Sequence, residues 1–343
     1  MPIARVDCDN GYAYFCNMKN VVILIPETAV IEAVADPHYM FKAVNQFLLS
    51  AGMPVLFNVQ LVAKTRDVKL GNSSFTVHAD MLLHEVKHAD IIFIPALSGD
   101  MKTAIELNKE LLPWITKQYN NGAEIASLCV GAFLLASTGL LDGKKCSTHW
   151  GFGNEFREMF PEVELVDGSI ITEEHRIYSS GGANSYWNLL LYLVEKYTNR
   201  HTAILASKYF AIDIDRKSQS AFTLFQGQKG HNDAEILKAQ EFIEENCHER
   251  ITIDMLAGMV AIGRRSFERR FKKETNNTVN EYIQRVKIEA AKRSFESSRK
   301  NINEVMYDVG YSDTKAFRTI FKKVTGLTPI EYRNKYNKQA AMA

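Results

Sequence analysis

An internal repeat in the C-terminal third constrains the fold more than any other feature of the chain. Matching residues stand 50 positions apart in its two copies: Phe267 and Phe317, Phe271-Lys272-Lys273 and Phe321-Lys322-Lys323, and Glu281-Tyr282 and Glu331-Tyr332. Upstream the match slips by one residue, so that Ala257 faces Met306 and Ala261 faces Gly310. A single inserted residue is tolerated inside a turn. The repeat therefore predicts two similar helical units.

Capping residues and helical periodicity define two helices in the first copy. Thr252 is an expected N-cap for a helix that ends near Val260, because a Thr side chain can accept a hydrogen bond from the first free amides. Ala261-Ile262-Gly263 forms the expected turn into the next helix. In that helix Phe267 and Phe271 lie four residues apart and share one face, which we expect to be buried.

The second copy carries the same signals. Asn301 and Glu304 have the spacing of a capping box at the start of its first helix. Gly310 supplies the expected sharp turn, and Ser312 is the expected cap of the second helix. The two phenylalanines of this copy again share the expected buried face.

The faces opposite these phenylalanines carry polar and basic side chains. The candidate DNA-binding residues are Arg264, Arg265, Glu268, Arg269 and Lys272 in the first copy, and Thr314, Lys315, Arg318, Thr319 and Lys322 in the second. A helix fits the major groove of DNA, where Arg reads guanine and Glu accepts from cytosine, while Lys neutralises phosphates. Two such helices about 34 Å apart enter successive grooves of one duplex. A solvated basic face on an ordinary helical bundle is the alternative interpretation.

Charge is distributed unevenly along the chain. Residues 231–343 contain 21 Lys and Arg against 16 Asp and Glu, a net charge of +5, whereas residues 1–230 have a net charge of −4. A basic C-terminal part favours a polyanionic partner, here double-stranded DNA.

Cysteine spacing and hydropathy limit the class of protein. The five cysteines are Cys8, Cys16, Cys129, Cys146 and Cys247. Their odd number and the lack of a CxxC motif are typical of reduced thiols in a cytoplasmic protein without structural zinc. No run approaches the roughly 18 apolar residues of a membrane span, and the first residues lack the layout of a signal peptide. We expect a cytoplasmic protein with no membrane contact, no metal and no cofactor.

Strand-like and helical segments alternate in the first two hundred or so residues. Short apolar runs predict buried strands at residues 21–25, 54–63, 90–96, 123–128 and 176–180. Amphipathic stretches between them predict helices at Tyr39–Leu49, Met101–Tyr119 and Val130–Ser137. Such alternation predicts an α/β fold with a mostly parallel sheet covered on both faces.

Changes in composition predict the domain boundaries. Residues 1–19 form an N-terminal extension of unassigned role, residues 20–225 the α/β domain, and residues 226–234 a polar linker. Residues 235–337 show only amphipathic helical patterns, which predicts an all-α domain with two helix-turn-helix motifs. A chain of 343 residues accommodates two such domains.

Residues 235–337 resemble the AraC/XylS type of DNA-binding domain. The second copy carries that family's signature, INEVMYDVGYSDTKAFRTIFKKVTGLTPIEYR, at residues 302–333. The resemblance implies that a long helix, here about Val279–Phe295, joins two recognition helices. It also places the base-reading positions of the family on candidate residues named above. Met306 departs from the small residue usual at its position, which implies local repacking.

A cysteine stands where a predicted strand turns into a predicted helix. The segment AEIASLCVGAFLLASTGLL, residues 123–141, places Cys129 in the tight turn. This is the layout of a nucleophile elbow, and the positive end of the following helix is expected to lower the pKa of the thiol. A buried structural cysteine is the alternative, because free cysteines pack as small apolar side chains.

The front of the chain, from about residue 20 to 222, resembles the ThiJ/PfpI domain of the class I glutamine amidotransferase-like superfamily. More narrowly it resembles the GlxA-like regulators, in which this domain precedes an AraC-type one. The resemblance is clearest in ASLCVGAFLLASTGLLDGKKCSTHW, residues 126–150. It implies a flavodoxin-like fold, pocket residues Cys129, His149, Glu32 and Gly99, and a homodimer formed through the α/β domain.

Two departures from the enzymatic members of that superfamily speak against catalysis. Val130 stands where those members carry His, and a base must lie within hydrogen-bond reach of the nucleophile. His149 could replace that base only by folding back. The oxyanion segment, PALSGD at residues 95–100, keeps one glycine. We expect no catalytic residue, and a transcription regulator that responds to a small-molecule effector bound near Cys129.

Two other functions stay open on the sequence alone. One is a Cys-dependent amidohydrolase or glyoxalase-like enzyme whose basic tail localises it on DNA; it predicts a thiol that is alkylated quickly at neutral pH. The other is a redox sensor in which Cys129 is oxidised reversibly and Cys146 resolves it. That function needs an exposed thiol of low pKa and a second cysteine close in space.

Overall fold

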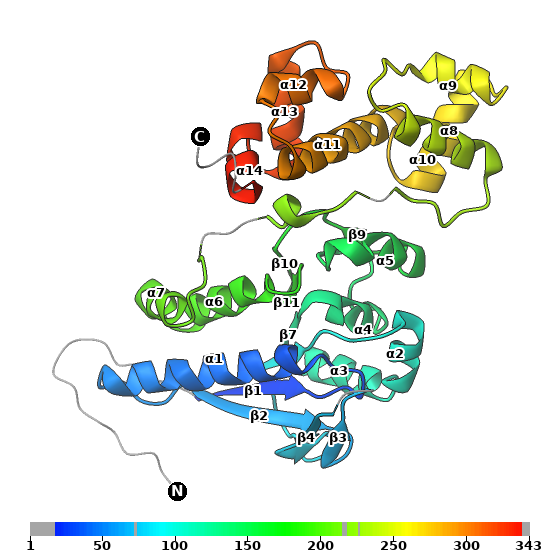
Figure 1. The fold of residues 1–343 in the computed structure, drawn as a ribbon. Coiled ribbons are helices and arrows are strands. Elements are labelled where there is room, and N and C mark those ends of the chain that lie inside the picture. Colours follow the sequence, from blue (N-terminus) through cyan, green and yellow to red (C-terminus); the bar gives the residue numbers. More distant parts are fainter. Residues whose placement is uncertain (1–17, 72–73, 215–217, 226, 338–343) are drawn as a thin grey trace, which may run out of the picture. The chain divides into compact units, whose positions relative to one another are not determined.

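The computed structural model describes residues 18–71, 74–214, 218–225 and 227–337 (Figure 1). The expected N-terminal extension, apart from its last two residues, lies outside this range, as do Cys8 and Cys16. The chain forms two compact units, Met1–Lys217 and Ser218–Ala343. Residues 218–225, expected at the end of the α/β domain, therefore belong to the second unit.

The first unit is built on a mostly parallel sheet. Its strands are β1 (Lys19–Leu24), β2 (Phe57–Ala63), β5 (Met81–Leu82), β6 (Ile91–Ile94), β7 (Glu124–Ser127), β10 (Ile171–Glu174) and β11 (Ile177–Ser180). They lie in the order β10-β11-β7-β6-β1-β2-β5, and only β10 pairs antiparallel to its neighbour. This arrangement confirms the flavodoxin-like α/β fold.

Short strands at the margins were missed by the periodicity argument. They are β3 (Asp67–Lys69), β4 (Thr76–His78), β8 (Lys145–Cys146) and β9 (Glu164–Leu165), together with the edge strands β5 and β10 of the main sheet. β3 and β4 form a hairpin, and β8 pairs with β9. Apart from β10, these segments of two or three residues are too short to show an alternating pattern.

Helices cover both faces of the main sheet. They are α1 (Ile31–Ser50), α2 (Met101–Leu107), α3 (Leu111–Asn120), α4 (Ala132–Ala136), α5 (Gly153–Met159), α6 (Tyr186–Tyr197) and α7 (Arg200–Tyr209), with short 3-10 turns η1 (Cys129–Gly131) and η2 (Trp150–Phe152). The β1-to-β2 and β6-to-β7 connections cross the sheet in opposite directions. Because such crossovers are right-handed, α1 lies on one face and α2 and α3 on the other. Helices α6 and α7 pack against α1.

The expected single helix Met101–Tyr119 is wrong, because Asn108 divides it into α2 and α3. The Asn108 side chain donates to the Ala104 carbonyl and to Thr28 Oγ1, and it accepts from the Glu27 amide at 2.9 Å. These bonds end α2 and attach the turn to the loop after β1. The amphipathic pattern continues through the break and could not reveal it.

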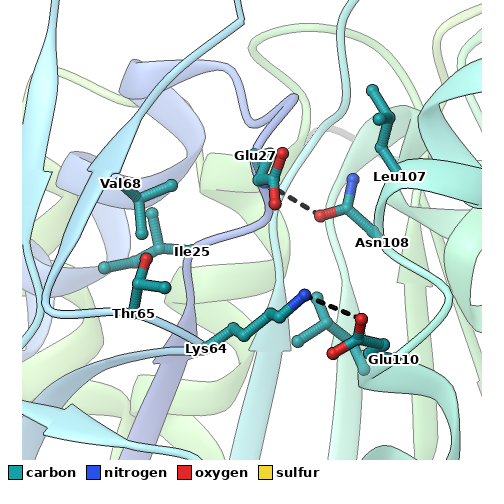
Figure 2. Close-up of a pocket in the computed structure, with 9 residues that line it drawn as sticks. Ile25, Glu27, Lys64, Thr65, Val68, Leu107, Asn108 and Glu110 are labelled. Carbon is teal, nitrogen blue, oxygen red and sulfur yellow. Dashed lines mark hydrogen bonds and ion pairs between the residues drawn. The ribbon is translucent and has the colours of Figure 1, made fainter.

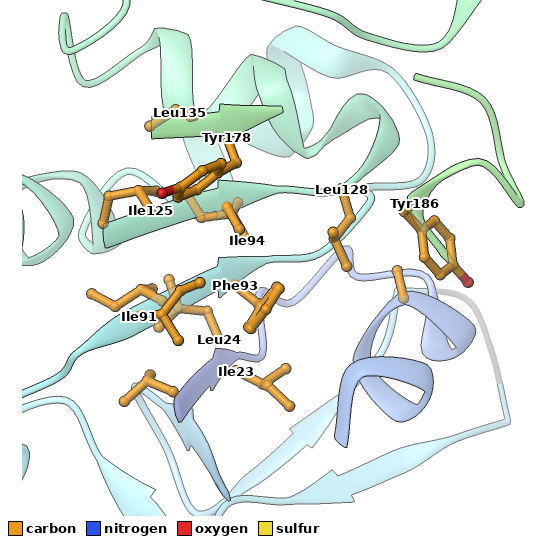
Figure 3. Close-up of a cluster of buried hydrophobic side chains, with 14 of the residues drawn as sticks. Ile23, Leu24, Ile91, Phe93, Ile94, Ile125, Leu128, Leu135, Tyr178 and Tyr186 are labelled. Carbon is orange, nitrogen blue, oxygen red and sulfur yellow. The ribbon is translucent and has the colours of Figure 1, made fainter. Parts of the chain in front are cut away.

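The central strands supply the core of the first unit. Val21, Ile23, Ile91 and Phe93 have no solvent-exposed surface. Figure 3 shows these strands with their apolar side chains, and Tyr186 beside helix α1. Burial on both faces explains why these strands are apolar throughout.

The second unit is entirely helical among its described residues. It contains η3 (Ser220–Phe222), α8 (Ala234–Glu245), α9 (Ile253–Met259), α10 (Arg264–Thr275), α11 (Val279–Ser297), α12 (Ile302–Asp308), α13 (Thr314–Thr325) and α14 (Pro329–Tyr336). Each copy of the repeat has its own apolar cluster, and the long helix α11 contributes to both. Tyr282 and Val286 belong to the first cluster, and Ile288 and Phe295 to the second.

The recurring Glu-Tyr pairs have a structural cause. Glu281 closes a capping box with Thr278 at the start of α11, and Glu331 does the same with Thr328 at the start of α14. The tyrosine that follows each glutamate is buried in the cluster of its own copy. The repeat therefore conserves both a helix start and the packing beneath it.

Most of the expected caps in the repeat are present. Thr252 accepts from the Met255 amide, and Asn301 forms a capping box with Glu304. Ser312 is a wrong prediction, since Asp313 caps α13 by accepting from two backbone amides. Either side chain suits an N-cap, so sequence alone did not decide between neighbours.

Candidate nucleic-acid interface and candidate ligand site

Helices α10 and α13 present equivalent faces in the two copies. Phe267 and Phe271 of α10, and Phe317 and Phe321 of α13, have no exposed surface. On the other side of these helices the exposed candidate residues are Arg264, Arg265, Arg269, Lys272, Lys315, Arg318, Thr319 and Lys322. Glu268 and Thr314 are partly exposed. The basic side chains therefore point outward over buried phenylalanines, as the sequence predicts.

Ion pairs engage some of the candidate residues of α10. Arg264 lies 2.9 Å from Asp254 and 3.7 Å from Glu268. Arg265 and Arg269 form no salt bridge within the described part of the chain. Unpaired guanidinium groups keep their donors available to a ligand.

An arginine that the sequence argument did not single out anchors α10. Arg270 donates two hydrogen bonds to Asp233, at 2.6 and 2.8 Å, and one to Glu235 at 2.7 Å. Asp233 also caps α8. The contact between Arg270 and Asp233 attaches α10 to the start of α8, and such paired donors fix orientation as well as distance. Its position on the side of the helix, between the buried and exposed faces, was the only sequence signal.

The candidate residues of α13 are less engaged. Thr319 Oγ1 donates to the Lys315 carbonyl at 2.8 Å, so its hydroxyl hydrogen bonds within the helix. Lys315, Arg318 and Lys322 form no salt bridge with other described residues. This surface carries uncompensated positive charge.

The segment leading into the helical unit is held on α11 by a buried ion pair. Lys292 Nζ lies 2.7 Å from Glu289 Oε2, and these side chains are 4% and 8% exposed. Lys292 also donates to the Thr223 carbonyl, and Glu289 accepts from the Phe225 amide at 3.2 Å. Tyr336 donates to the Ala221 carbonyl at 3.1 Å. The residues before α8 thus form part of the helical unit.

The turn after β7 has the geometry of a nucleophile elbow. Cys129 adopts a φ of 56°, in the left-handed region that non-glycine residues rarely occupy. Two residues later, a Cβ on Gly131 would lie 2.5 Å from the carbonyl oxygens of both Ile94 and Pro95. Only glycine lets the turn pack this closely on the end of β6.

The expected low pKa of this thiol is wrong. Cys129 is buried, and burial raises its pKa to about 11, although a hydrogen bond from the Val130 amide acts in the opposite direction. Burial also raises the pKa of the Cys146 thiol to about 12. The thiolate is destabilised by burial more than it is stabilised by the positive end of the short helix that follows. Neither cysteine has the exposed, acidic thiol that a redox sensor needs.

Only some of the expected pocket residues lie close to Cys129. Thr148 Oγ1 donates to the Cys129 carbonyl at 3.1 Å, which brings the segment before His149 against the elbow. His149 Nδ1 accepts from the Gly151 amide at 3.0 Å, so the ring caps its own loop. Burial lowers the pKa of His149. No hydrogen bond joins His149 to Cys129 among the described residues.

Glu32 and Gly99 lie at the same end of the sheet. Glu32 is exposed in the first turn of α1. One turn later Asp36 accepts from Tyr186 Oη at 2.6 Å, and burial and this hydrogen bond raise the pKa of Tyr186, with smaller contributions from nearby Glu32 and Cys129. Gly99 adopts a φ of 84° before Asp100 caps α2. Asp36 and Tyr186 were not predicted from the sequence, because 150 residues separate them in the chain.

Alkylation of Cys129 is expected to be slow in the folded protein. With a pKa of about 11, its thiolate is about a hundredfold scarcer at pH 7.5 than that of an ordinary thiol. Iodoacetamide labelling followed by mass spectrometry of the Cys129 peptide measures the rate, and the same peptide in urea is the reference. A native rate equal to the rate in urea would contradict this geometry and favour the enzyme alternative.

A small pocket with a mixed polar and apolar lining lies at the carboxyl ends of β1 and β2 (Figure 2). About 300 Å³ of space, open to solvent, is lined mainly by Glu27, Lys64, Asn108 and Glu110 together with apolar side chains. Lys64 and Glu110 pair across it at 2.7 Å. None of the expected pocket residues lines it, and Lys64 is already paired with Glu110, which leaves the carboxylate of Glu27 as its remaining charged group.

The described residues offer no candidate metal cluster and no candidate membrane span. No group of three or more His, Cys, Asp and Glu side chains is placed to hold a metal ion there. No described helix is long and apolar enough to cross a membrane.

Comparison with known proteins identifies relatives of both units. The model of the DJ-1/PfpI family matches residues 19–196, and that of a helix-turn-helix domain matches residues 256–335. The chain is 27% identical over 215 residues to the HTH-type transcriptional regulator ArgR of Pseudomonas aeruginosa, covering 62% of this chain and 65% of that protein. It is 26% identical over 228 residues to GbdR, an HTH-type transcriptional regulator of the same species, covering 66% of this chain and 62% of that protein. The chain thus spans just under two thirds of the length of these relatives.

One solved structure supports the fold of the first unit. It is a candidate transcriptional regulator from Vibrio parahaemolyticus, with a TM-score of 0.51 and 22% identity. The match covers 56% of this chain and 99% of that one.

Proposed function

The chain belongs to the DJ-1/PfpI family, and because a helix-turn-helix domain follows the family domain we propose that it is a sequence-specific DNA-binding transcription regulator. The observation that carries this proposal is the pair of equivalent helices, α10 and α13, with basic side chains exposed over buried phenylalanines. Relatives named as HTH-type transcriptional regulators support it. We propose a cytoplasmic location, because the DNA of a bacterium such as Pseudomonas aeruginosa, the source of these relatives, lies in the cytoplasm.

Each recognition helix combines two kinds of contact. Arg265 and Arg269 have free guanidinium groups, which can read guanine with two hydrogen bonds. Lys272 and Lys322, near the ends of their helices, are placed to neutralise phosphates. The uncharged Thr314 and Thr319 would contact bases or sugars in the second groove. Double-stranded DNA is therefore the proposed partner.

Selection of duplexes from a random pool tests the function directly. The full chain is expected to enrich one sequence with two recognised elements, since two helices enter successive grooves. Failure to enrich any duplex at low salt would count against the function. Repeating the selection with and without small metabolites reports effector dependence at the same time.

Two substitutions on α10 are expected to have different consequences. Arg269→Ala should weaken binding to the selected duplex by about 1–3 kcal/mol and relax the preference at one base pair. Lys272→Ala should weaken binding to all sequences similarly and reduce the salt dependence by about one phosphate contact. Fluorescence anisotropy over a salt series measures both effects. Lys117→Ala, an exposed lysine of the first unit, is the charge-matched control.

The first unit is proposed to bind a small-molecule effector near Cys129, without catalysis. Tyr186, hydrogen-bonded to Asp36, lies near Cys129 and Glu32, and Gly99 and His149 belong to loops at the same end of the sheet. The raised pKa of Cys129 and the occupied Nδ1 of His149 speak against an amidohydrolase or glyoxalase-like activity. Pairing of two chains through this unit would bring four recognition helices to DNA. Sedimentation of the full chain tests that pairing.

A further inference from the structure

A buried lysine lies near the middle of α11, between the two apolar clusters. Lys287 is 7% exposed and follows Val286 of the first cluster and precedes Ile288 of the second. Its Nζ donates three hydrogen bonds, to the carbonyl oxygens of Cys247 at 2.8 Å, Glu249 at 2.9 Å and Val309 at 2.9 Å. All three donors of the ammonium group are therefore used.

The three acceptors come from segments that belong to the two halves of the helical unit. Cys247 and Glu249 lie in the connection between α8 and α9, just before the first copy, and Cys247 packs against the apolar cluster of that copy. Val309 is the C-cap of α12, in the turn that leads to the recognition helix α13. One side chain thus joins the loop that precedes the first copy to the helix-turn-helix turn of the second.

The backbone segments around Lys287 are in direct contact, so the position of one segment constrains the other. Gly310 has a φ of 72°, and a Cβ there would lie 2.5 Å from both the His248 carbonyl oxygen and Lys287 Nζ. The turn of the second copy therefore touches the α8–α9 connection directly. Tyr311 adds its ring, 5.8 Å from Lys287 Nζ.

The buried positive charge of Lys287 is unfavourable for the free energy of folding. Among the described residues Lys287 has no carboxylate partner, and burial lowers its pKa. A buried ammonium group is costly unless its donors are satisfied. An apolar side chain would fill this space without that cost, and some buried polar groups are kept because they select one geometry among several.

We propose that Lys287 is a positioning residue that fixes the separation and orientation of recognition helices α10 and α13, and through them the spacing of the two DNA elements that the protein accepts. This inference rests on the proposed DNA-binding function. When α10 and α13 are held rigidly, both helices can enter the major groove of a duplex whose two recognised elements have the correct spacing. On a duplex with altered spacing, only one of the two helices can bind. When Lys287 is replaced, the two copies of the repeat can change their separation, so that both helices bind either duplex.

Spacing variants of the selected duplex test this role with the full chain. One base pair is inserted or removed between the two recognised elements, and the dissociation constant is compared with that of the original duplex. For the wild-type chain the ratio is expected to be about a hundredfold, because binding of the second helix is lost. For Lys287→Met the ratio should fall to about threefold or less, while binding to a single element stays near that of the wild type.

Controls separate positioning from loss of stability. Ile236→Ala, which opens the first apolar cluster away from the junction, should weaken binding through unfolding but keep the wild-type ratio. If Lys287→Met does not fold, Lys287→Gln, which retains an amide donor, is measured in the same way. A wild-type spacing ratio in the folded Lys287 variant would overturn the inference.

A measurement without DNA distinguishes the two proposals. Spin labels on Lys273→Cys and Lys323→Cys, equivalent exposed positions of α10 and α13, report the distance between the helices once other reactive cysteines are replaced. We expect one narrow distance in the parent chain and a broad distribution in Lys287→Met. A narrow, unchanged distance in that variant would refute the positioning role even when DNA binding is intact. Failure of the parent chain to select any duplex counts against the DNA-binding function, whereas the label distance still decides the role of Lys287.

Discussion

Lys292→Met is expected to lower the free energy of unfolding of the helical unit by about 3–5 kcal/mol, because it leaves the Glu289 carboxylate buried without its partner. The Thr223 carbonyl loses a donor in the same step. Urea unfolding followed by far-UV circular dichroism measures the loss. All three tryptophans, Trp114, Trp150 and Trp187, lie in the first unit. Their fluorescence transition should therefore stay unchanged, which assigns the loss to the helical unit.

Two further variants show whether the buried charge is the cause. Glu289→Leu combined with Lys292→Met removes both charges and should recover most of the stability, leaving about 1–2 kcal/mol lost through the unpaired Phe225 amide. Lys300→Met breaks an exposed pair with Asp308 and should have no measurable effect. If Lys292→Met destabilises no more than Lys300→Met, the pair is not buried in solution.

The same buried pair marks a limit of inference from sequence. Glu289 and Lys292 are three residues apart on an amphipathic helix, a spacing typical of solvent-exposed ion pairs. They are buried because residues 218–225, more than 60 positions earlier in the chain, pack over them. Lys287 is buried by other segments distant in the chain, the α8–α9 connection and the turn after α12. No local pattern reports a contact made across such a separation.

Local chemistry, by contrast, predicted most of the helical unit. Thr252 and Asn301 cap their helices as expected, and the offset of 50 residues corresponds to repeated capping boxes and buried aromatic rings. The positions of β1, β2, β6, β7 and β11 also followed from apolar runs longer than three residues. These features depend on neighbours within about four positions, which is the range that a sequence pattern samples.

The elbow at Cys129 contains one success and one failure. The tight turn was predictable, because a strand, a small-residue turn and a helix follow one another in residues 123–141. The thiol pKa was not, because it depends on how completely the Cys129 side chain is buried. A helix terminus contributes a local term, whereas desolvation is a property of the assembled unit.

Truncating one buried phenylalanine in each recognition helix, Phe271 in α10 or Phe321 in α13, is expected to have a comparably large effect. Phe271→Ala and Phe321→Ala each remove a fully buried ring and should lower the free energy of unfolding by about 3–5 kcal/mol. The two rings belong to separate apolar clusters, but α11 contributes to both clusters and Lys287 joins their loops. We therefore expect both variants to shift the same single transition of circular dichroism.

The control for these truncations is Tyr307→Ala on α12, since that ring is 63% exposed and its loss should change stability by no more than about 0.5 kcal/mol. A two-step transition in Phe271→Ala, with the second copy unfolding at the wild-type urea concentration, would mean that the copies fold independently. In that case α11 would act as a tether, and a rigid spacing between α10 and α13 could not be maintained by Lys287. A single shifted transition requires that the two copies be coupled through α11, the condition under which they act on DNA as one rigid body.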